Sequence, residues 1–134
     1  MPSVIADTHT IIWYFSNHPK LSNTANTVLT QTIAEGGSIF ISAISLIEIT
    51  YLIEKDRLPS EALASLQDAL QDSKTAIELI PIDLNIATEM SQIKREIVPD
   101  MPDRIIAATA LSLNLPLVTR DRQIQQAANI QTIW

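Results

Sequence analysis

Two kinds of apolar pattern alternate along the chain. Short runs rich in Ile, Val, Leu and Phe predict buried strands, and the segments between them carry apolar residues at helical spacing. The expected strands are residues 3–7, 38–42, 77–80 and 117–119, with a last edge strand over residues 130–134. Alternating strands and helices predict one α/β domain over residues 1–134, with a mostly parallel central sheet of four to five strands flanked by helices.

Capping residues and helix breakers set the expected helix boundaries. Ser22 is an expected N-cap, and the pair Gly36-Gly37 should end the helix that Ser22 begins. Pro59 separates two further helices, and Asp83 is expected to cap another. The predicted helices cover residues 8–16, 22–35, 45–57, 60–72, 84–97, 104–113 and 121–128, and a loop covers residues 98–103.

Four acidic residues fall at one edge of the predicted sheet. Asp7 ends the first strand, and Glu48 lies in the first turn of the helix after the second strand. Asp103 begins the helix that leads into the fourth strand, and Asp121 follows that strand by two residues. The carboxyl ends of parallel strands share one edge, where open α/β sheets bind their ligands. The four carboxylates are therefore expected to lie together.

Such a cluster needs a counter-charge. Two like charges about 4 Å apart repel by roughly 4 kcal/mol at an effective dielectric constant near 20. Protonation or a cation must relieve this repulsion, and hard all-oxygen sites suit Mg²⁺ or Mn²⁺. A metal held in this way can activate water for displacement at phosphorus.

Each acid also has a structural interpretation. Ser45 and Glu48 match the Ser-x-x-Glu pattern of a capping box. Asp103 and Asp121 could each be a helix N-cap, and Asp7 could stabilise a turn or a cap. These alternatives stay open for single residues, but four structural acids meeting at one sheet edge by chance is less expected.

Composition narrows the chemistry further. The chain has no cysteine, which excludes disulfides and thiolate sites, and only 2 glycines, which excludes phosphate-binding glycine loops. The 2 histidines do not form a His-x-x-x-His pair. No signal peptide or apolar membrane span is visible, so we expect a cytoplasmic protein. The net charge of −6 taken alone argues against broad nucleic-acid binding.

Four motifs together resemble a known family. They are IADTH at residues 5–9, SAISLIEI at 42–49, PDRIIAATA at 102–110 and LVTRD at 117–121. In this order and spacing, over essentially the whole chain, the sequence resembles the PIN-domain ribonucleases found as VapC toxins in VapBC toxin–antitoxin pairs. Trp13, which follows the Asp-Thr-His start, is similar to one subgroup of this family.

The resemblance implies a function and a site. Asp7, Glu48, Asp103 and Asp121 would bind one or two Mg²⁺ or Mn²⁺ ions, with Asp100 as an extra acid nearby. The implied reaction is endonucleolytic hydrolysis of single-stranded or loop RNA, leaving 5′-phosphate and 3′-hydroxyl ends. The implied supporting residues are Thr119, Thr8 and His9, and RNA phosphate could contact Arg104, Arg120 and Arg122, which could instead neutralise the acids.

The resemblance also implies partners. A homodimer is expected, together with a cognate VapB-like antitoxin that blocks the site. The helices over residues 45–72 are the expected contact, with Tyr51, Leu52 and Leu58 either in that contact or in the core. Two divalent ions would offset four negative charges and leave the late arginines as a basic rim, so the acidic balance does not exclude RNA.

Two other classes remain as alternatives. One is a phosphoaspartate domain, either a response-regulator receiver or a haloacid-dehalogenase-like phosphatase, but Asp7 lacks an acidic partner close by and His9 stands where the phosphatase needs a second Asp. The other is a non-catalytic PIN-like binding protein, which the complete set of four acids disfavours.

Overall fold

A computed structural model, which describes residues 2–134, contains a central sheet of five strands. The strand order across the sheet is β3-β2-β1-β4-β5, and every neighbouring pair is parallel. The predicted parallel α/β class is therefore confirmed, including the last edge strand. The strands are β1 (Val4–Ala6), β2 (Ile39–Ser42), β3 (Ile77–Ile80), β4 (Leu117–Val118) and β5 (Thr132–Ile133).

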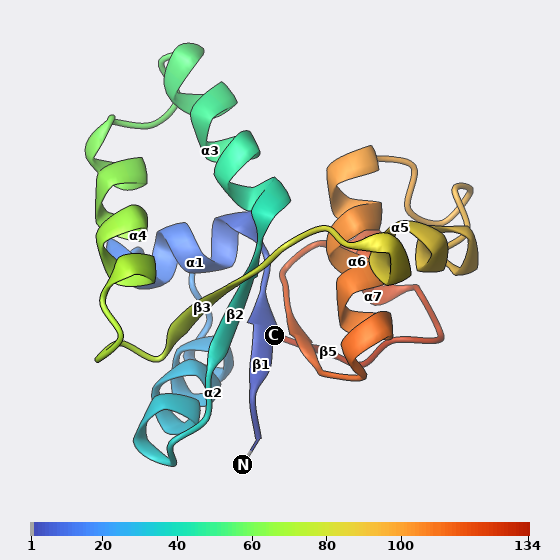
Figure 1. Cartoon of the computed structure of the whole chain (residues 1–134), viewed down its shortest axis with the longest axis horizontal. Helices are drawn as coiled ribbons and strands as arrows, with labels where there is room; N and C mark the ends of the chain where they lie inside the picture. Colours follow the sequence, from blue (N-terminus) through green and yellow to red (C-terminus); the bar gives the residue numbers. More distant parts are fainter. Residues whose placement is uncertain (1) are drawn as a thin grey trace.

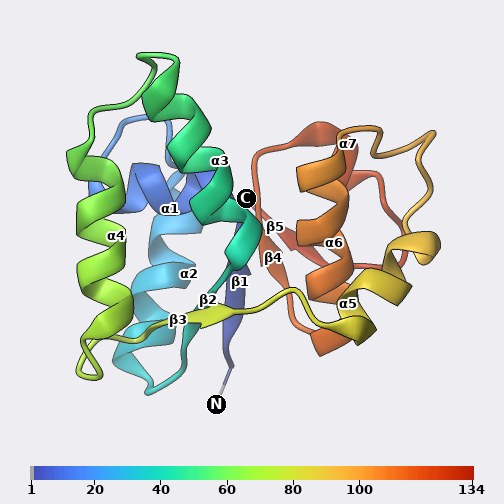
Figure 2. The ribbon, with the colours of Figure 1, turned by 45° about the horizontal axis from the view of Figure 1, so that its top comes forward.

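Helices cover both faces of this sheet, as Figures 1 and 2 show. One face carries α1 (Thr8–Phe15), α2 (Asn23–Ala34), α3 (Ala43–Glu54) and α4 (Glu61–Gln71). The other face carries α5 (Leu84–Glu89), α6 (Met101–Leu113) and α7 (Arg122–Gln125), with a short 3₁₀ turn, η1 (Met90–Gln92), after α5. Among residues 2–134, no helix is long and apolar enough to cross a bilayer.

The core lies in two layers because side chains alternate along β1. Val4 and Ala6 pack with Ile11 of α1 and Leu29 of α2, whereas Ile5 packs with the α5–α6–α7 side. Helix α3 contributes to both layers, since Ile44 packs on the α5–α6–α7 side and Ile49 packs on the α1–α2 side. Each fully buried Ile or Leu stabilises the fold by roughly 1.5–3 kcal/mol, so β1 is fixed from both faces.

Two predicted helix boundaries near the sheet edge are wrong. The helix expected over residues 84–97 ends at Glu89, and the guanidinium of Arg104 donates to the carbonyl oxygens of Met90 and Ile93 at 2.9 Å each. The Met90 carbonyl also accepts from the backbone N–H of Ile93, so α5 narrows into the 3₁₀ turn η1 at the point where Arg104 of α6 binds it. The expected loop at 98–103 is helical from Met101, because Asp100 rather than Asp103 is the N-cap of α6.

The capping box that was an alternative interpretation of Glu48 does not form. Helix α3 begins at Ala43, and the side chain of Ser42 caps it by accepting from the backbone N–H of Ile44. Glu48 consequently lies in the second turn rather than the first. By contrast, the predicted caps Ser22 of α2 and Asp83 of α5 are confirmed.

Candidate active site

The four acids predicted to cluster line one cavity of about 570 Å³. It lies where β1 and β4 end and where α1, α6 and α7 begin, and the second turn of α3 adds Glu48. Asp100 is a fifth acid in the same wall. The lining residues are Asp7, Thr8, His9, Trp13, Glu48, Asp100, Asp103, Arg120, Asp121 and Arg122.

Asp7 is buried at the carboxyl end of β1, with 8% of its surface exposed. One carboxylate oxygen caps α1 by accepting from the backbone N–H of Thr10 at 2.9 Å. The other accepts from the hydroxyl of Thr119. Burial raises the pKa of Asp7, although these hydrogen bonds lower it in part. The capping role considered for Asp7 is therefore real, and the same carboxyl group lines the cavity.

Glu48 is held by a short chain of hydroxyl groups. The Thr8 hydroxyl oxygen lies 2.5 Å from a Glu48 carboxylate oxygen and 2.9 Å from the Ser45 hydroxyl oxygen. An ionised carboxylate only accepts, and Thr8 has one proton to give. Thr8 must then donate to Glu48 while Ser45 donates to Thr8. Both hydroxyl residues are buried, so the position of Glu48 depends on them.

The charges of Asp100 and Asp103 are crowded at the start of α6. Asp100 accepts from the backbone N–H of Asp103 at 3.2 Å. Burial, followed by the charges of the four other cavity acids, raises the pKa of Asp103 from 3.8 to about 8. Burial and two of the same acids also raise the pKa of Glu48, against the hydrogen bond from Thr8. The carboxylates are close enough to oppose one another's ionisation.

Thr119, directly after β4, links Asp7 at the end of β1 to Asp121 at the start of α7. Its hydroxyl donates to Asp7, and its hydroxyl oxygen accepts from the backbone N–H of Asp121 at 3.0 Å. Asp121 in turn caps α7 by accepting from the backbone N–H groups of Gln123 and Ile124. Thr119 is fully buried, so this connection is part of the folded core.

The three arginines expected near RNA are placed differently. Arg120 and Arg122 line the cavity and are exposed. Arg104 is not among the lining residues, because its guanidinium is bound to the carbonyls of Met90 and Ile93. The structure thus brings Arg120 and Arg122 to the acids, and gives Arg104 contacts that hold the turn after α5 against α6.

Two residues of this site had no clear signal in the sequence. Ser45 was considered only as a helix cap, whereas the structure places its hydroxyl behind Thr8. Its position three residues before Glu48 could have indicated this contact, since residues three apart share a helix face. The sequence offers Asp100 only as an extra acid nearby, whereas in the structure Asp100 caps α6 and lines the cavity together with Asp103.

The donor set fits a hard divalent cation. Across residues 2–134, no three His, Asp or Glu side chains already converge tightly enough to form a ready metal cage. Mg²⁺ does not require such a cage, because it keeps several waters and binds directly to only one or two carboxylates. The raised pKa values of Asp7, Glu48 and Asp103 show a site in which added positive charge would be favourable.

Known proteins resemble this chain in sequence and in fold. The chain is 26% identical over 136 residues to ribonuclease VapC22 of Mycobacterium tuberculosis, covering 100% of both chains. A DNA-bound VapBC structure from Salmonella typhimurium matches with a TM-score of 0.72 at 25% identity, covering 98% of this chain and 97% of that one.

A second solved structure shares the fold. Promoter-bound VapBC2 from Rickettsia felis matches with a TM-score of 0.72 at 20% identity, covering 97% of this chain and 96% of that one. The PIN domain family model matches residues 4–130, which is nearly the whole chain. Together with the shared strand architecture and the acid-lined cavity at the sheet edge, this match shows that the chain belongs to the PIN domain family.

Proposed function

We propose that residues 1–134 form a single PIN domain that acts as a metal-dependent endoribonuclease, the toxin of a VapBC-type pair. The observation that carries this proposal is that five carboxylates line one cavity, where burial and then their mutual repulsion raise the pKa of Asp103 to about 8. The full-length similarity to a VapC ribonuclease supports RNA as the substrate.

In this proposal Asp7, Glu48, Asp103 and Asp121 hold one or two Mg²⁺ or Mn²⁺ ions. A bound cation of this kind supplies Lewis-acid activation of an attacking water and neutralises charge at phosphorus. The chain's own part is to position the ligands. Thr119 fixes Asp7 relative to Asp121, and the Ser45–Thr8 pair fixes Glu48.

The cavity acids would hold the metal, and the basic side chains beside them would bind the substrate. Arg120 and Arg122 lie beside the acids and can bind phosphate oxygens of the RNA backbone. His9 lines the same cavity and is exposed, so it can approach the same phosphates.

The phosphoaspartate alternative is not favoured. Receiver domains have the strand order 2-1-3-4-5, whereas this sheet has the order 3-2-1-4-5. A haloacid-dehalogenase-like phosphatase would need a second Asp where this chain has His9. The non-catalytic alternative is disfavoured because a binding protein has no need to keep five repelling carboxylates in one cavity.

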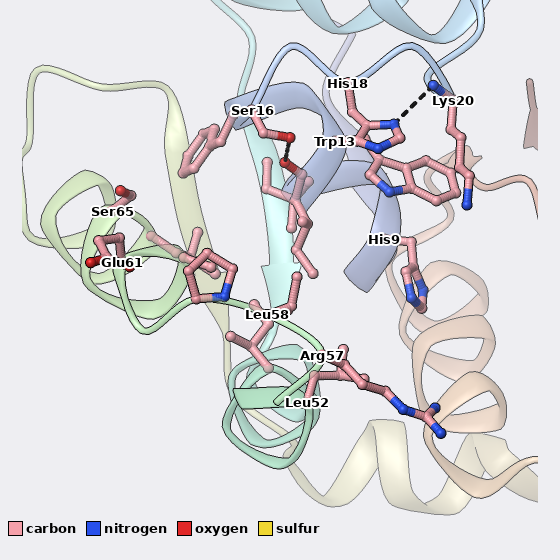
Figure 3. Close-up of a pocket in the computed structure, with 17 residues that line it drawn as sticks. His9, Trp13, Ser16, His18, Lys20, Leu52, Arg57, Leu58, Glu61 and Ser65 are labelled. Atoms are coloured by element: carbon pink, nitrogen blue, oxygen red, sulfur yellow. Dashed lines mark hydrogen bonds between the residues drawn. The ribbon is translucent and has the colours of Figure 1, made fainter. Parts of the chain in front are cut away.

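We further propose an antitoxin partner, because the solved relatives include VapBC complexes. A groove of about 660 Å³ lies between α1, α3 and α4 and shares His9 and Trp13 with the acid cavity (Figure 3). Leu52 and Leu58 line this groove, so the helices expected to contact the antitoxin do offer an apolar surface. An antitoxin segment in the groove would reach the acids.

A homodimer and a cytoplasmic location remain part of the proposal. Ile47 and Tyr51 lie four residues apart on α3 and are 50% and 60% exposed, and Tyr51 does not line the groove. An exposed apolar face of this kind is available to a second copy of the chain.

The test is cleavage of a labelled RNA with Mn²⁺ by the parent protein and by Asp7→Asn. Asn is as good an N-cap as Asp, so α1 should stay in place while cleavage is lost. A Glu78→Gln variant, which changes an exposed acid on β3, is the matched control. Equal cleavage by the parent and Asp7→Asn would refute the assignment of the site.

A further inference from the structure

A group of aromatic and cationic side chains surrounds Trp13 next to the acid cavity. The ring centroids of His9, His18 and Trp134 lie 5.5, 5.9 and 6.0 Å from that of Trp13. The charged ends of Lys20 and Arg120 lie 5.9 and 5.8 Å from the same ring. We call these residues the tryptophan cluster: His9, Trp13, His18, Lys20, Arg120 and Trp134.

The cluster lies where two hollows meet. His9 and Trp13 line both the acid cavity and the apolar groove, and Arg120 lines the acid cavity while His18 and Lys20 line the groove. Figure 3 shows the His18 ring against Trp13, with Lys20 beside it and His9 one turn earlier on α1. The His18 ring nitrogen accepts from the backbone N–H of Lys20 at 3.0 Å, which fixes that ring.

Charge distinguishes this place from the rest of the molecule. The chain has a net charge of −6, yet Lys20 and Arg120 each lie near the ring of Trp13, which borders the cavity lined by five acids. Trp13 is only partly buried, and His9, Lys20 and Arg120 are exposed. A ring that served the core alone would have apolar neighbours, so these neighbours indicate a surface that meets a ligand.

Nucleic acid matches this combination of groups. Aromatic rings and guanidinium planes stack on unpaired bases with little sequence preference. Lysine and arginine bind the phosphates between those bases. A base in a duplex is already stacked on its neighbours and cannot use such a ring without unpairing. The cluster therefore fits single-stranded RNA and not a helix.

We propose that the tryptophan cluster is a subsite for unpaired nucleotides next to the phosphate that is cleaved. The inference rests on the proposed function in taking RNA as the substrate. A base would stack on the Trp13–His18 pair, and Arg120 and Lys20 would bind the phosphates on either side. Lys20 and Arg120 attract RNA phosphates, whereas an antitoxin segment in the neighbouring groove would reach the acids past the same side chains and would compete with RNA there.

The two tryptophans of the chain make the subsite directly observable. Both Trp13 and Trp134 belong to the cluster, so intrinsic tryptophan fluorescence reports on it alone. The probe is an unstructured oligoribonucleotide of about ten nucleotides, compared with the same strand in a duplex. The measurement is made in an Asp103→Asn background, which keeps the strand intact. Quenching by the single strand and not by the duplex is expected.

Variants separate stacking from charge. Trp13→Leu should weaken binding of the single strand about tenfold, and Trp13→Phe should retain most of the affinity. Lys20→Gln and Arg120→Gln should each lower the slope of log affinity against log salt by about 0.7. The control is Lys74→Gln, which removes an exposed cation that lines neither the acid cavity nor the groove, and it should leave the slope unchanged.

The outcomes that overturn the subsite differ from those that overturn the nuclease. Unchanged affinity in folded Trp13→Leu and in Arg120→Gln, with cleavage by the parent intact, would refute the subsite alone. If folded Trp13→Leu bound a basic apolar peptide more weakly than the parent but bound RNA equally well, the surface would belong to a protein partner and the proposal would be refuted. Failure of the parent to cleave RNA with Mn²⁺ would refute the proposed function instead.

Discussion

Replacing Asp103 by Asn should stabilise the protein in the absence of metal, and increasingly so as the pH rises. Asp103 is half-buried among four other acids, which with burial raise its pKa from 3.8 to about 8. A carboxyl group whose pKa is higher in the folded state binds protons more tightly there than in the unfolded chain. The free energy of unfolding therefore falls as the pH rises from about 4 to about 8. Asn has the same shape and never ionises.

The size of the effect can be bounded from the pKa. Each pH unit between the unfolded and folded pKa values corresponds to about 1.36 kcal/mol, so the upper limit is roughly 6 kcal/mol at alkaline pH. Water and salt screen a half-buried carboxylate, which reduces the expected gain to about 1–3 kcal/mol. For a chain of this length, a gain of this size raises the Tm by roughly 3–10 °C.

The assay is thermal unfolding followed by circular dichroism in EDTA, at about pH 4.5 and about pH 8. The Tm difference between Asp103→Asn and the parent should be small at the lower pH and large at the higher one. Added Mn²⁺ should reverse the order, because it stabilises the folded parent by mass action. An equal Tm at both pH values, or a less stable variant in EDTA at the higher pH, would refute the repulsion argument.

Three further perturbations test other parts of the structure. Thr119→Val removes the hydroxyl between two acids and should lower the free energy of unfolding by about 1–3 kcal/mol in urea titrations, whereas Thr119→Ser should recover most of the loss. Thr8→Val removes the hydrogen-bond donor to Glu48 and should raise the pKa of that carboxyl further. Calorimetry should then show a larger loss of Mn²⁺ affinity at about pH 6 than at about pH 8, and equal losses would contradict this. Leu66→Ala opens a cavity in the core and should cost about 2–5 kcal/mol while leaving Mn²⁺ affinity unchanged.

The sheet could be predicted because its signals are local. The strands are short, apolar and separated by helices, and alternating order implies parallel pairing. The edge rule for parallel strands then placed Asp7, Glu48, Asp103 and Asp121 at one end of the sheet, and all four line the same cavity. The sequence positions of these acids were sufficient because each is tied to the end of a strand or the start of a helix.

The helix ends could not be predicted as well, because they depend on distant contacts. Ser42 and Ser45 are equally good caps by type, and the choice of Ser42 follows from where β2 stops in its register with β3. Helix α5 ends early because Arg104, on another helix, binds the carbonyls that follow it. Neither contact can be predicted from the residues that are adjacent in the sequence.

The finer parts of the site also required tertiary structure. The hydroxyl chain from Ser45 through Thr8 to Glu48 joins α1 to α3, and residue spacing cannot set a distance between two helices. Trp134 meets Trp13 across more than a hundred residues, so the tryptophan cluster depends on how the last strand packs.

The central position of β1 has a consequence for when the protein becomes active. In the sheet, β1 pairs with β4, and Ile5 is in register with Leu117, so strands from opposite ends of the chain must meet. The buried contact between Asp7 and Thr119 forms only after that pairing. A chain in which β1 and β4 have not met has no assembled acid cavity, so the site becomes competent only when residues more than a hundred positions apart have come together.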